Sequence, residues 1–451
     1  MKQITTLYIQ EQKKRAETVR LPDEKERDRE RDLINLYPQA RYQRIEGFGG
    51  AFTDAAGYVF SLMPKELQRQ FLDGYFSKEG LGYTCGRTSI DSCDFSRECY
   101  ASDDTPGDTA LEHFDIFRPG KYVLPLLKGA QETAGKPIRM MFTPWTPPAW
   151  MKTNGSRLGG GRLKKEYYGV WAEYICRYLL AFRAEGAQAV YLSPQNEPKA
   201  AQTWDSCLFS PEEEQEFIRD HLSPALQKNG LKDVGVLIWD HNKERAFDRA
   251  WDILKDPKTA GLVAGVAMHW YSGDHFEALQ LIRDAFPDKK LIFSEACVEY
   301  SLYAGENQLR NAQMYAHDLI GNLNHGLNLF LDWNLLLDQQ GGPNHVGNFC
   351  DAPVMYDTET GKLRFNLSYD YIGHFSRYIQ PGAERIGLSR FTDRIEAMAA
   401  LNPDGALAVV ALNRTKEKIA FCFRLNGKVW PVELEGESIA TFLFDPNEWK
   451  E

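Results

Sequence analysis

Eight short apolar runs, each of a length suited to a strand, recur through the middle of this 451-residue chain. Each run is followed by a stretch of helical periodicity or by a long loop. We place the strands at residues 47–53, 84–90, 138–144, 188–195, 234–240, 265–271, 290–296 and 328–334. Alternation of strands and helices over eight repeats is the pattern of a closed (β/α)8 barrel with a parallel sheet. The barrel therefore takes up most of the chain.

Helical periodicity fills most of the intervals between these strands. Ser210 followed by Pro211 is typical of the first residues of a helix, where a hydroxyl caps the free N–H groups and proline costs no hydrogen bond. The predicted helices are Lys65–Phe76, Lys121–Thr133, Lys164–Glu185, Pro211–Asn229, Asp274–Phe286 and Asn307–Leu323.

The two ends of the chain have a different pattern. After about Ser376 the helical period stops, and short apolar or alternating runs stand between turn signals such as Asn426-Gly427, which predicts an antiparallel β-sandwich. Its predicted strands are Ile395–Leu401, Ala406–Leu412, Ile419–Leu425 and Ile439–Phe444. Near the start we predict short strands at Ile4–Ile9, Leu33–Tyr37 and Tyr42–Ile45, and a solvated helix or loop at Asp23–Asp32.

These patterns divide the chain into an N-terminal segment of residues 1–45, a barrel of residues 46–378 and a C-terminal β-sandwich of residues 379–451. The net charge of −10 argues against nucleic acid and anionic membranes as partners. No apolar run reaches the roughly 18 residues of a spanning helix, so no stable membrane insertion is expected. The first residues lack the apolar core of a signal peptide, which favours a cytoplasmic protein.

The eight cysteines include no C-x-x-C pair, so they indicate neither a zinc site nor a disulfide framework. The nine histidines are scattered and form no H-x-H pair of the kind that metal-dependent barrel hydrolases use. We therefore expect no metal and no cofactor. The oligomeric state is left open by the sequence.

Two glutamates stand where barrel enzymes carry their chemistry, at the carboxyl ends of strands. Glu197 follows the apolar run 189–192, and Glu295 follows Leu291–Phe293, about three βα units later. A pair of such carboxylates is what glycoside hydrolysis needs: one protonates the leaving oxygen, and the other is a nucleophile or a base. The alternative role for Glu197 is part of a helix cap. Glu299 competes with Glu295, but Glu295 ends the apolar run directly, and strand parity places it on the face of Leu291 and Phe293.

The sequence resembles glycoside hydrolase family 30, which includes glucosylceramidases, β-glucosidases, β-xylosidases and endo-β-1,6-glucanases. The resemblance runs from Ile45 to about Leu388. The motifs that carry it are NEP (196–198), SEAC (294–297), EGFGGAFTDAAG (46–57), SCDFS (92–96), TPWTPPAWMKTNG (143–155), MHWYSG (268–273), LDWNLLLD (331–338) and GGPNHVGNF (341–349). It implies a retaining β-glycosidase of a barrel and a side β-domain, to which the N-terminal strands contribute.

The resemblance also implies roles for single residues. Glu197 is the expected general acid/base, which requires a raised pKa, and Glu295 the expected nucleophile. Asn196 matches a residue that bonds the sugar 2-hydroxyl, although such a residue also suits a turn. Asp94 matches a carboxylate that accepts bonds from glucose hydroxyls, although it also suits an Asx-turn. Asn348 matches a residue of the entrance loop.

Several other residues are candidates for binding or support. Trp145, Tyr271 and Trp333 follow apolar strands and match sugar-binding positions, although buried aromatic residues more often belong to a core. Arg87 lies within a strand and needs a buried partner, and we expect it to keep Glu295 ionised. His269 either orients a catalytic group or is a core histidine.

Two positions near the predicted site have weaker assignments. Cys297 follows the second glutamate closely and is expected to pack rather than to react. His345 stands where related enzymes carry an aromatic residue, which puts an aglycone contact there in question.

The predicted function is a β-glucosidase or glucosylceramidase-like exo-enzyme that acts on a small β-glycoside or oligosaccharide. The alternatives are an endo-β-1,6-glucanase or a β-xylosidase of the same family and, more distantly, a non-catalytic carbohydrate-binding barrel. The loops around the sugar subsites decide among the hydrolases, and the sequence does not define them.

Overall fold

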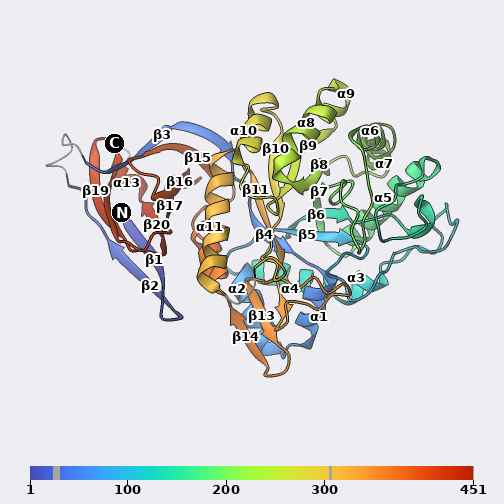
Figure 1. Ribbon diagram of the computed structural model, residues 1–451, viewed down its shortest axis with the longest axis horizontal. Helices are drawn as coiled ribbons and strands as arrows, with labels where there is room; N and C mark the ends of the chain where they lie inside the picture. The colour runs from blue at the N-terminus through green and yellow to red at the C-terminus, as the bar shows by residue number, and fades with distance from the viewer. Residues whose placement is uncertain (24–30, 304–306, 450–451) are drawn as a thin grey trace.

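The structure, a computed structural model, describes residues 1–23, 31–303 and 307–449, and consists of a barrel with a β-sandwich beside it (Figure 1). The barrel is closed by eight parallel strands in the order β10-β11-β4-β5-β6-β7-β8-β9. Their bounds are β4 Gly47–Ala51, β5 Cys85–Ile90, β6 Arg139–Pro144, β7 Gln188–Leu192, β8 Gly235–Asn242, β9 Val263–His269, β10 Lys290–Glu295 and β11 Leu329–Asn334. The predicted (β/α)8 barrel is confirmed, and each strand overlaps its predicted range.

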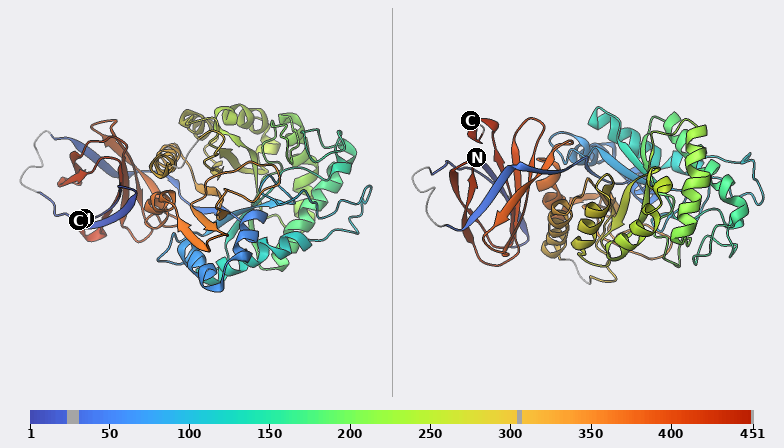
Figure 2. Two further views of the ribbon diagram at one scale, coloured as in Figure 1. Left: turned by 60° about the horizontal axis from the view of Figure 1, so that its bottom comes forward. Right: turned by 90° about the horizontal axis from the view of Figure 1, so that it is seen from above.

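Helices surround the barrel (Figure 2). The predicted helix at 211–229 is built from α6, a π-helical segment at Phe217–Leu222, and α7. All six predicted helices are present within a few residues of their predicted ends. The helices are α1 Asp54–Leu62, α2 Lys65–Phe76, α3 Phe117–Lys121, α4 Val123–Ala134, α5 Tyr168–Ala184, α6 Pro211–Glu216, α7 Ser223–Lys228, α8 Ala246–Leu254, α9 Pro257–Ala260, α10 Phe276–Ala285, α11 Gln308–Asn324, α12 Leu367–Ser376 and α13 Pro446–Trp449.

Successive side chains along each barrel strand point alternately into the barrel and outward to the helices, so they form two separate cores. One row fills the barrel and includes Met141, Leu237 and Ile292. The other row points outward and packs against the helices, as Leu291 and Phe293 do. Strands buried on both faces explain why the sequence shows continuous apolar runs rather than alternation. None of the helices within the described ranges is long and apolar enough to cross a membrane.

The second sheet has nine strands in the order β19-β18-β3-β15-β16-β17-β20-β1-β2 and curls into the sandwich at the left of Figure 1. Its strands are β1 Lys2–Ile9, β2 Gln12–Val19, β3 Leu33–Arg44, β15 Glu384–Arg390, β16 Ile395–Leu401, β17 Leu407–Asn413, β18 Ile419–Leu425, β19 Lys428–Leu434 and β20 Ser438–Phe444. Phe423, Trp430 and Phe442 are among the side chains of its enclosed core. The predicted β-sandwich is confirmed, with strands from both ends of the chain.

Some predictions for this domain were wrong or incomplete. The two short strands predicted at Leu33–Tyr37 and Tyr42–Ile45 are one strand, β3, whose register against β15 shifts twice. Strand β2 was not predicted, because it is exposed along its whole length and therefore has no apolar pattern. Strands β15 and β19 were not predicted either. Most of the predicted charged segment Asp23–Asp32 lies outside the described residues.

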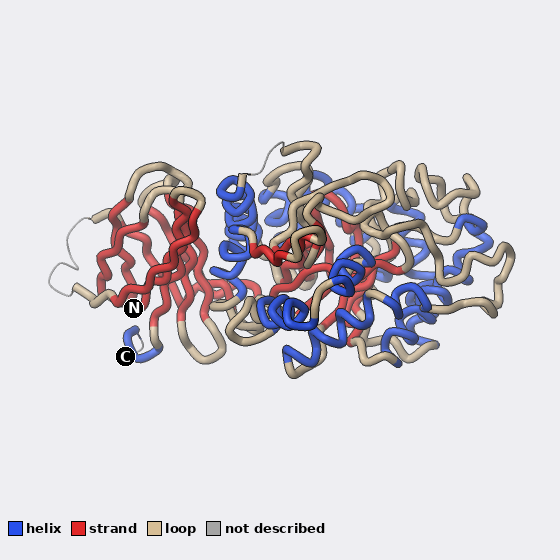
Figure 3. Tube along the Cα trace, turned by 90° about the horizontal axis from the view of Figure 1, so that it is seen from below, coloured by secondary structure: helices blue, strands red, loops and turns tan. Residues whose placement is uncertain are grey.

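Helix α11 lies between the barrel and the sandwich (Figure 1), and α12 packs against α11 and against strand β20 of the sandwich; Figure 3 shows helices at this boundary from below. On α12, the buried His374 joins the two domains: its ring nitrogens lie 2.8 Å from the hydroxyls of Thr6 and Thr441. A small third sheet near the end of the barrel is formed by β12 Leu337–Asp338, β13 Val354–Asp357 and β14 Lys362–Phe365. The long loops that follow the barrel strands carry most of the candidate site.

Candidate active site

Glu197 and Glu295 meet at the carboxyl ends of the barrel strands, where both line a cavity of about 150 Å³. The ring of His269 lies between them. Its Nδ1 is 3.4 Å from Oε1 of Glu197, and its Nε2 is 4.0 Å from Oε2 of Glu295. Two glutamates far apart in the sequence thus belong to one site, together with a histidine that contacts both.

A β-bulge explains how Glu295 reaches the cavity. The register of β10 against β9 shifts between Phe293 and Glu295. Regular alternation would place Glu295 on the outer face of the barrel with Leu291 and Phe293, which pack against the helices. The strand-parity argument made from the sequence was therefore wrong about the face, although Glu295 is the residue that lines the cavity. Bulges at barrel rims re-aim side chains in this way.

The surroundings of Glu197 combine backbone geometry with two histidines. Its φ of 46° lies in the left-handed region, and its N–H donates to the carbonyl of Asp240 at 3.0 Å. His241 Nδ1 lies 3.6 Å from its carboxylate, and Gln202 Nε2 lies at 3.5 Å. Burial raises the pKa of Glu197, but contact with His269 and the charge of His241 outweigh burial and lower it. The pKa of this glutamate is therefore lowered, whereas the sequence predicted a raised one.

Arg87 connects the site from inside the barrel. Its fully buried guanidinium donates to Glu295, and one nitrogen, Nη2, lies 2.9 Å from both Asn196 Oδ1 and Asp240 Oδ2. The predicted partnership between Arg87 and Glu295 is thus present. Tyr271 donates to the other oxygen of Glu295 at 2.9 Å. Glu295 is therefore held on both oxygens.

Asp240, at the end of β8, connects the arginine to His269. Its Oδ1 accepts from Ser294 Oγ at 2.6 Å and lies 3.1 Å from Nε2 of His269. Burial opposes a charged imidazole, but the carboxylates of Glu295, Asp240 and Glu197 outweigh it and raise the pKa of His269 to about 9. His269 is therefore protonated at neutral pH, which supports the orienting role over the core role.

The predicted sugar-binding residues also line the cavity. Trp145 and Trp333 stack with ring centroids 5.3 Å apart, and Arg87 packs over both rings. In the wall of the cavity, Nδ2 of Asn348 donates a hydrogen bond to Oδ2 of Asp94 at 3.1 Å. Burial and the charge of Glu295 raise the pKa of Asp94 well above its ordinary value. Aromatic faces beside amide and carboxyl groups are suited to a sugar ring and its hydroxyls.

Asp240, which contacts Arg87 and His269 but does not line the cavity, was not among the predicted site residues, and neither were several residues that do line it. Asp240 has the same signature as the two glutamates, a carboxylate directly after the apolar run of a strand, and could have been found by that signal. No sequence signal indicated the others, which are Gln202, Trp204, His241 and Asn242. Glu299 also lines the cavity, and burial together with Glu295 and Glu197 raises its pKa. His345 does not line it.

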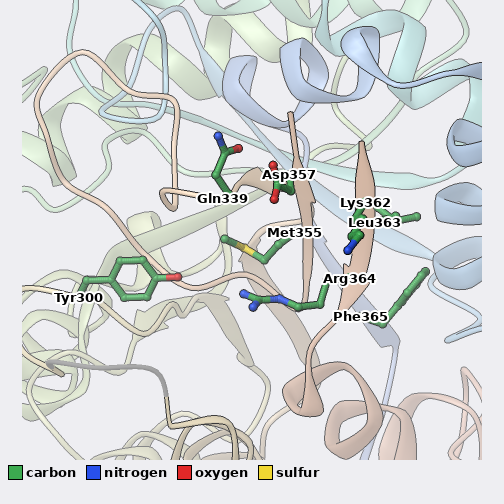
Figure 4. Close-up of a pocket in the computed structure, with 8 residues that line it drawn as sticks. All are labelled: Tyr300, Gln339, Met355, Asp357, Lys362, Leu363, Arg364 and Phe365. Carbon is green, nitrogen blue, oxygen red and sulfur yellow. The ribbon is translucent and has the colours of Figure 1, made fainter. Parts of the chain in front are cut away.

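A larger cavity, about 930 Å³, lies against β13 and β14 (Figure 4). The close-up shows Met355 and the side chain of Arg364 between Tyr300 and the strands. None of the candidate site residues lines this cavity, although Tyr300 follows Glu299 in sequence. Size therefore does not identify the reaction site, whereas the cluster of carboxylates, histidines and arginine does.

Comparison with known proteins identifies the family of the chain. The glycosyl hydrolase family 30 TIM-barrel domain matches residues 45–379, and the family 30 β-sandwich domain matches residues 382–442. The lysosomal acid glucosylceramidase of Mus musculus is 35% identical over 404 residues, which cover 86% of this chain and 78% of that protein.

Two solved structures extend the comparison. The crystal structure of SrfJ from Salmonella typhimurium shares 39% identity, with a TM-score of 0.94 and coverage of 98% of this chain and 99% of that one. The structure of an endo-β-1,6-glucanase shares 28% identity, with a TM-score of 0.87 and coverage of 98% of this chain and 99% of that one. The resemblance seen in the sequence motifs is confirmed, and the chain belongs to glycosyl hydrolase family 30.

Proposed function

We propose that this chain is a retaining β-glycosidase that releases one sugar at a time, with Glu197 as acid/base and Glu295 as nucleophile. The observation that carries the proposal is the difference between their partners. Glu295 is paired with Arg87, which stays charged at every working pH. Glu197 contacts His269 and His241, which gain and lose protons. A nucleophile must stay ionised, whereas an acid/base must exchange a proton.

The histidine also accounts for the low pKa of Glu197. We infer that His269 and Glu197 share one proton that lies mainly on the ring, because its Nδ1 is 3.4 Å from Oε1 of Glu197 and the pKa of His269 is raised to about 9. When Glu295 attacks the anomeric carbon, charge develops on the leaving oxygen, and Glu197 delivers the proton to it. This proton comes from His269, which passes it to Glu197, so that the pair ends the first step without it. In the second step Glu197 accepts a proton from water, which attacks the same carbon, and the bond to Glu295 breaks. Two inversions retain the configuration.

The space around the site supports a single sugar with an apolar aglycone. A second cavity, about 480 Å³, adjoins the first and shares Tyr271, Cys297 and Glu299 with it. Its wall combines charged side chains such as Arg310 and Asp318 with the apolar Tyr303 and Leu302, and Leu302 is 64% exposed. Exposed apolar groups beside a small polar cavity fit a glucosylceramide-like substrate. The similarity to the named glucosylceramidase supports the same substrate class.

A panel of 4-nitrophenyl β-glycosides, together with glucosylceramide and a β-1,6-glucan, tests the specificity. We expect turnover of the β-glucoside and of glucosylceramide, with glucose as the first product. Preferential cleavage of the glucan to oligosaccharides would favour the endo-glucanase instead, and preference for the xyloside a β-xylosidase. Binding of these sugars with no turnover of any of them would leave only the non-catalytic barrel.

Proton NMR of the earliest product tests the mechanism. The β-anomer should appear first, since the configuration is retained. An initial α-anomer would refute the double displacement.

A further inference from the structure

Three side chains from three separate loops converge just outside the catalytic cavity. Cys99 lies in the loop after β5, Asp205 in the loop after β7, and His345 between β12 and β13. The Sγ of Cys99 is 3.3 Å from Nε2 of His345 and 3.8 Å from Oδ2 of Asp205. The distance between that nitrogen and that oxygen is 3.7 Å. The catalytic mechanism uses none of the three.

These distances fit a single tetrahedral ion. Zinc binds sulfur at about 2.3 Å and nitrogen or oxygen at about 2.0–2.2 Å, so neighbouring ligand atoms around it lie about 3.4–3.6 Å apart. All three distances lie within about 0.3 Å of this range. Thiolate, imidazole and carboxylate are also the ligand types that zinc takes in proteins.

The neighbours of His345 and Asp205 aim their free atoms at the same point. Nδ1 of His345 lies 2.7 Å from the carbonyl oxygen of Ser96, so this nitrogen donates and the lone pair of Nε2 faces the cluster. Asp205 is fully buried, and its Oδ1 accepts from Arg157 Nε at 2.7 Å and Ser92 Oγ at 2.9 Å. Its Oδ2 is left to face Cys99 and His345.

The charges also suit a divalent cation. The guanidinium of Arg157 lies between Asp205 and Asp91, the second at 4.0 Å, so one cation faces two carboxylates. An ion that binds the Cys99 thiolate must displace the proton of the thiol. Because Cys99 is exposed, ions can reach the site from solvent.

We propose that Cys99, Asp205 and His345 bind one Zn²⁺ ion that clamps the three loops at the rim of the cavity. The clamp would act close to the substrate. Trp204 precedes Asp205 and lines the cavity. Asn348, three residues after His345, lines it too and donates to Asp94. The ion fixes these loops relative to one another and takes no part in the chemistry.

Cobalt substitution in the purified full-length chain tests the site, after chelation and removal of the chelator. One equivalent of Co²⁺ should give intense visible bands of tetrahedral geometry and a near-ultraviolet thiolate-to-cobalt band, and one equivalent of Zn²⁺ should abolish both. Cys99→Ser should remove the thiolate band. His345→Gln should weaken Zn²⁺ binding at least tenfold. Cys422→Ser is the matched control, because Cys422 is also partly accessible but lies in the sandwich.

A second readout is independent of the spectrum. Zn²⁺ should raise the midpoint of thermal unfolding of the wild type and of Cys422→Ser, and should raise those of Cys99→Ser and His345→Gln by clearly less at the same Zn²⁺ concentration. The proposal is overturned if the wild type binds no Zn²⁺ at micromolar concentration. It is also overturned if Cys99→Ser or His345→Gln binds Zn²⁺ as tightly as the control.

Discussion

Replacing Asp240 with asparagine should lower the pKa of His269, so that the pair of His269 and Glu197 loses its shared proton at a lower pH. The charge of Asp240 is one of the causes that raise the pKa of His269 from an ordinary 6.5 to about 9. Asparagine keeps the shape, but one side of its amide becomes a donor. The least costly orientation turns this NH₂ toward His269 and Ser294 and leaves the oxygen to Arg87. The ring must then present an unprotonated Nε2, which favours neutral His269.

The expected change in the pH dependence of activity follows from the shift in the pKa of His269. A difference between about 9 and 6.5 corresponds to about 3 kcal/mol of preference for the charged ring. If the variant loses all of it, the alkaline midpoint of kcat/KM falls from about 9 toward 6.5. At pH 8 the active fraction then falls about thirtyfold. The charged ring also stabilises the fold, fully below pH 6.5 and progressively less as pH rises through 9, and the variant should lose this dependence.

The assay is the pH dependence of kcat/KM with a 4-nitrophenyl β-glycoside, combined with NMR titration of ¹³C-labelled histidine. The signal absent from His269→Gln identifies the ring. Ser294→Ala is the control, because it removes one hydrogen bond to Asp240 and keeps the charge. The control should shift both midpoints only slightly. If Asp240→Asn had the wild-type alkaline midpoint and the wild-type pKa of His269, the shared-proton reasoning would be refuted.

Three further predictions concern other parts of the structure. Arg87→Met should lower the free energy of unfolding by about 3–5 kcal/mol in urea denaturation, because two buried carboxylates lose their cation; wild-type stability would contradict this. Asp94→Ala should lower kcat/KM for the preferred glycoside about 10–100-fold through lost hydrogen bonds to hydroxyls, whereas an unchanged value would place Asp94 outside the sugar site. His374→Phe should cost about 1–3 kcal/mol, seen as a lower thermal midpoint, because the hydroxyls of Thr6 and Thr441 lose their partner; an unchanged midpoint would contradict this role.

The strands of the barrel were predictable because burial on both faces leaves long apolar runs, which end where the chain reaches the rim. Glu197 and Glu295 were visible as carboxylates at two such ends. The face of Glu295 was not predictable, since the bulge after Phe293 changes the register and no local pattern announces it. The exposed strand β2 was missed for the opposite reason, because it buries nothing.

Most contacts between the site residues could not be predicted from the sequence either. Arg87 was expected to meet Glu295, but its contacts with Asp240 and Asn196 depend on how the strands meet inside the barrel. Cys99 illustrates the same limit: spacing rules detect ligands that lie close along the chain. The proposed zinc ligands come from three loops, against the expectation that the cysteines mark no metal site.

The roles of the two glutamates are tested most directly by the configuration of the product formed with azide. With a dinitrophenyl glycoside and Glu197→Ala, glycosylation of Glu295 needs no acid, and azide needs no base to attack the intermediate. The account predicts the β-glycosyl azide from this variant. Glu295→Ala has no nucleophile, so azide attacks from the opposite face and gives the α-azide. An α-azide from Glu197→Ala, or a β-azide from Glu295→Ala, would show that the two roles are reversed.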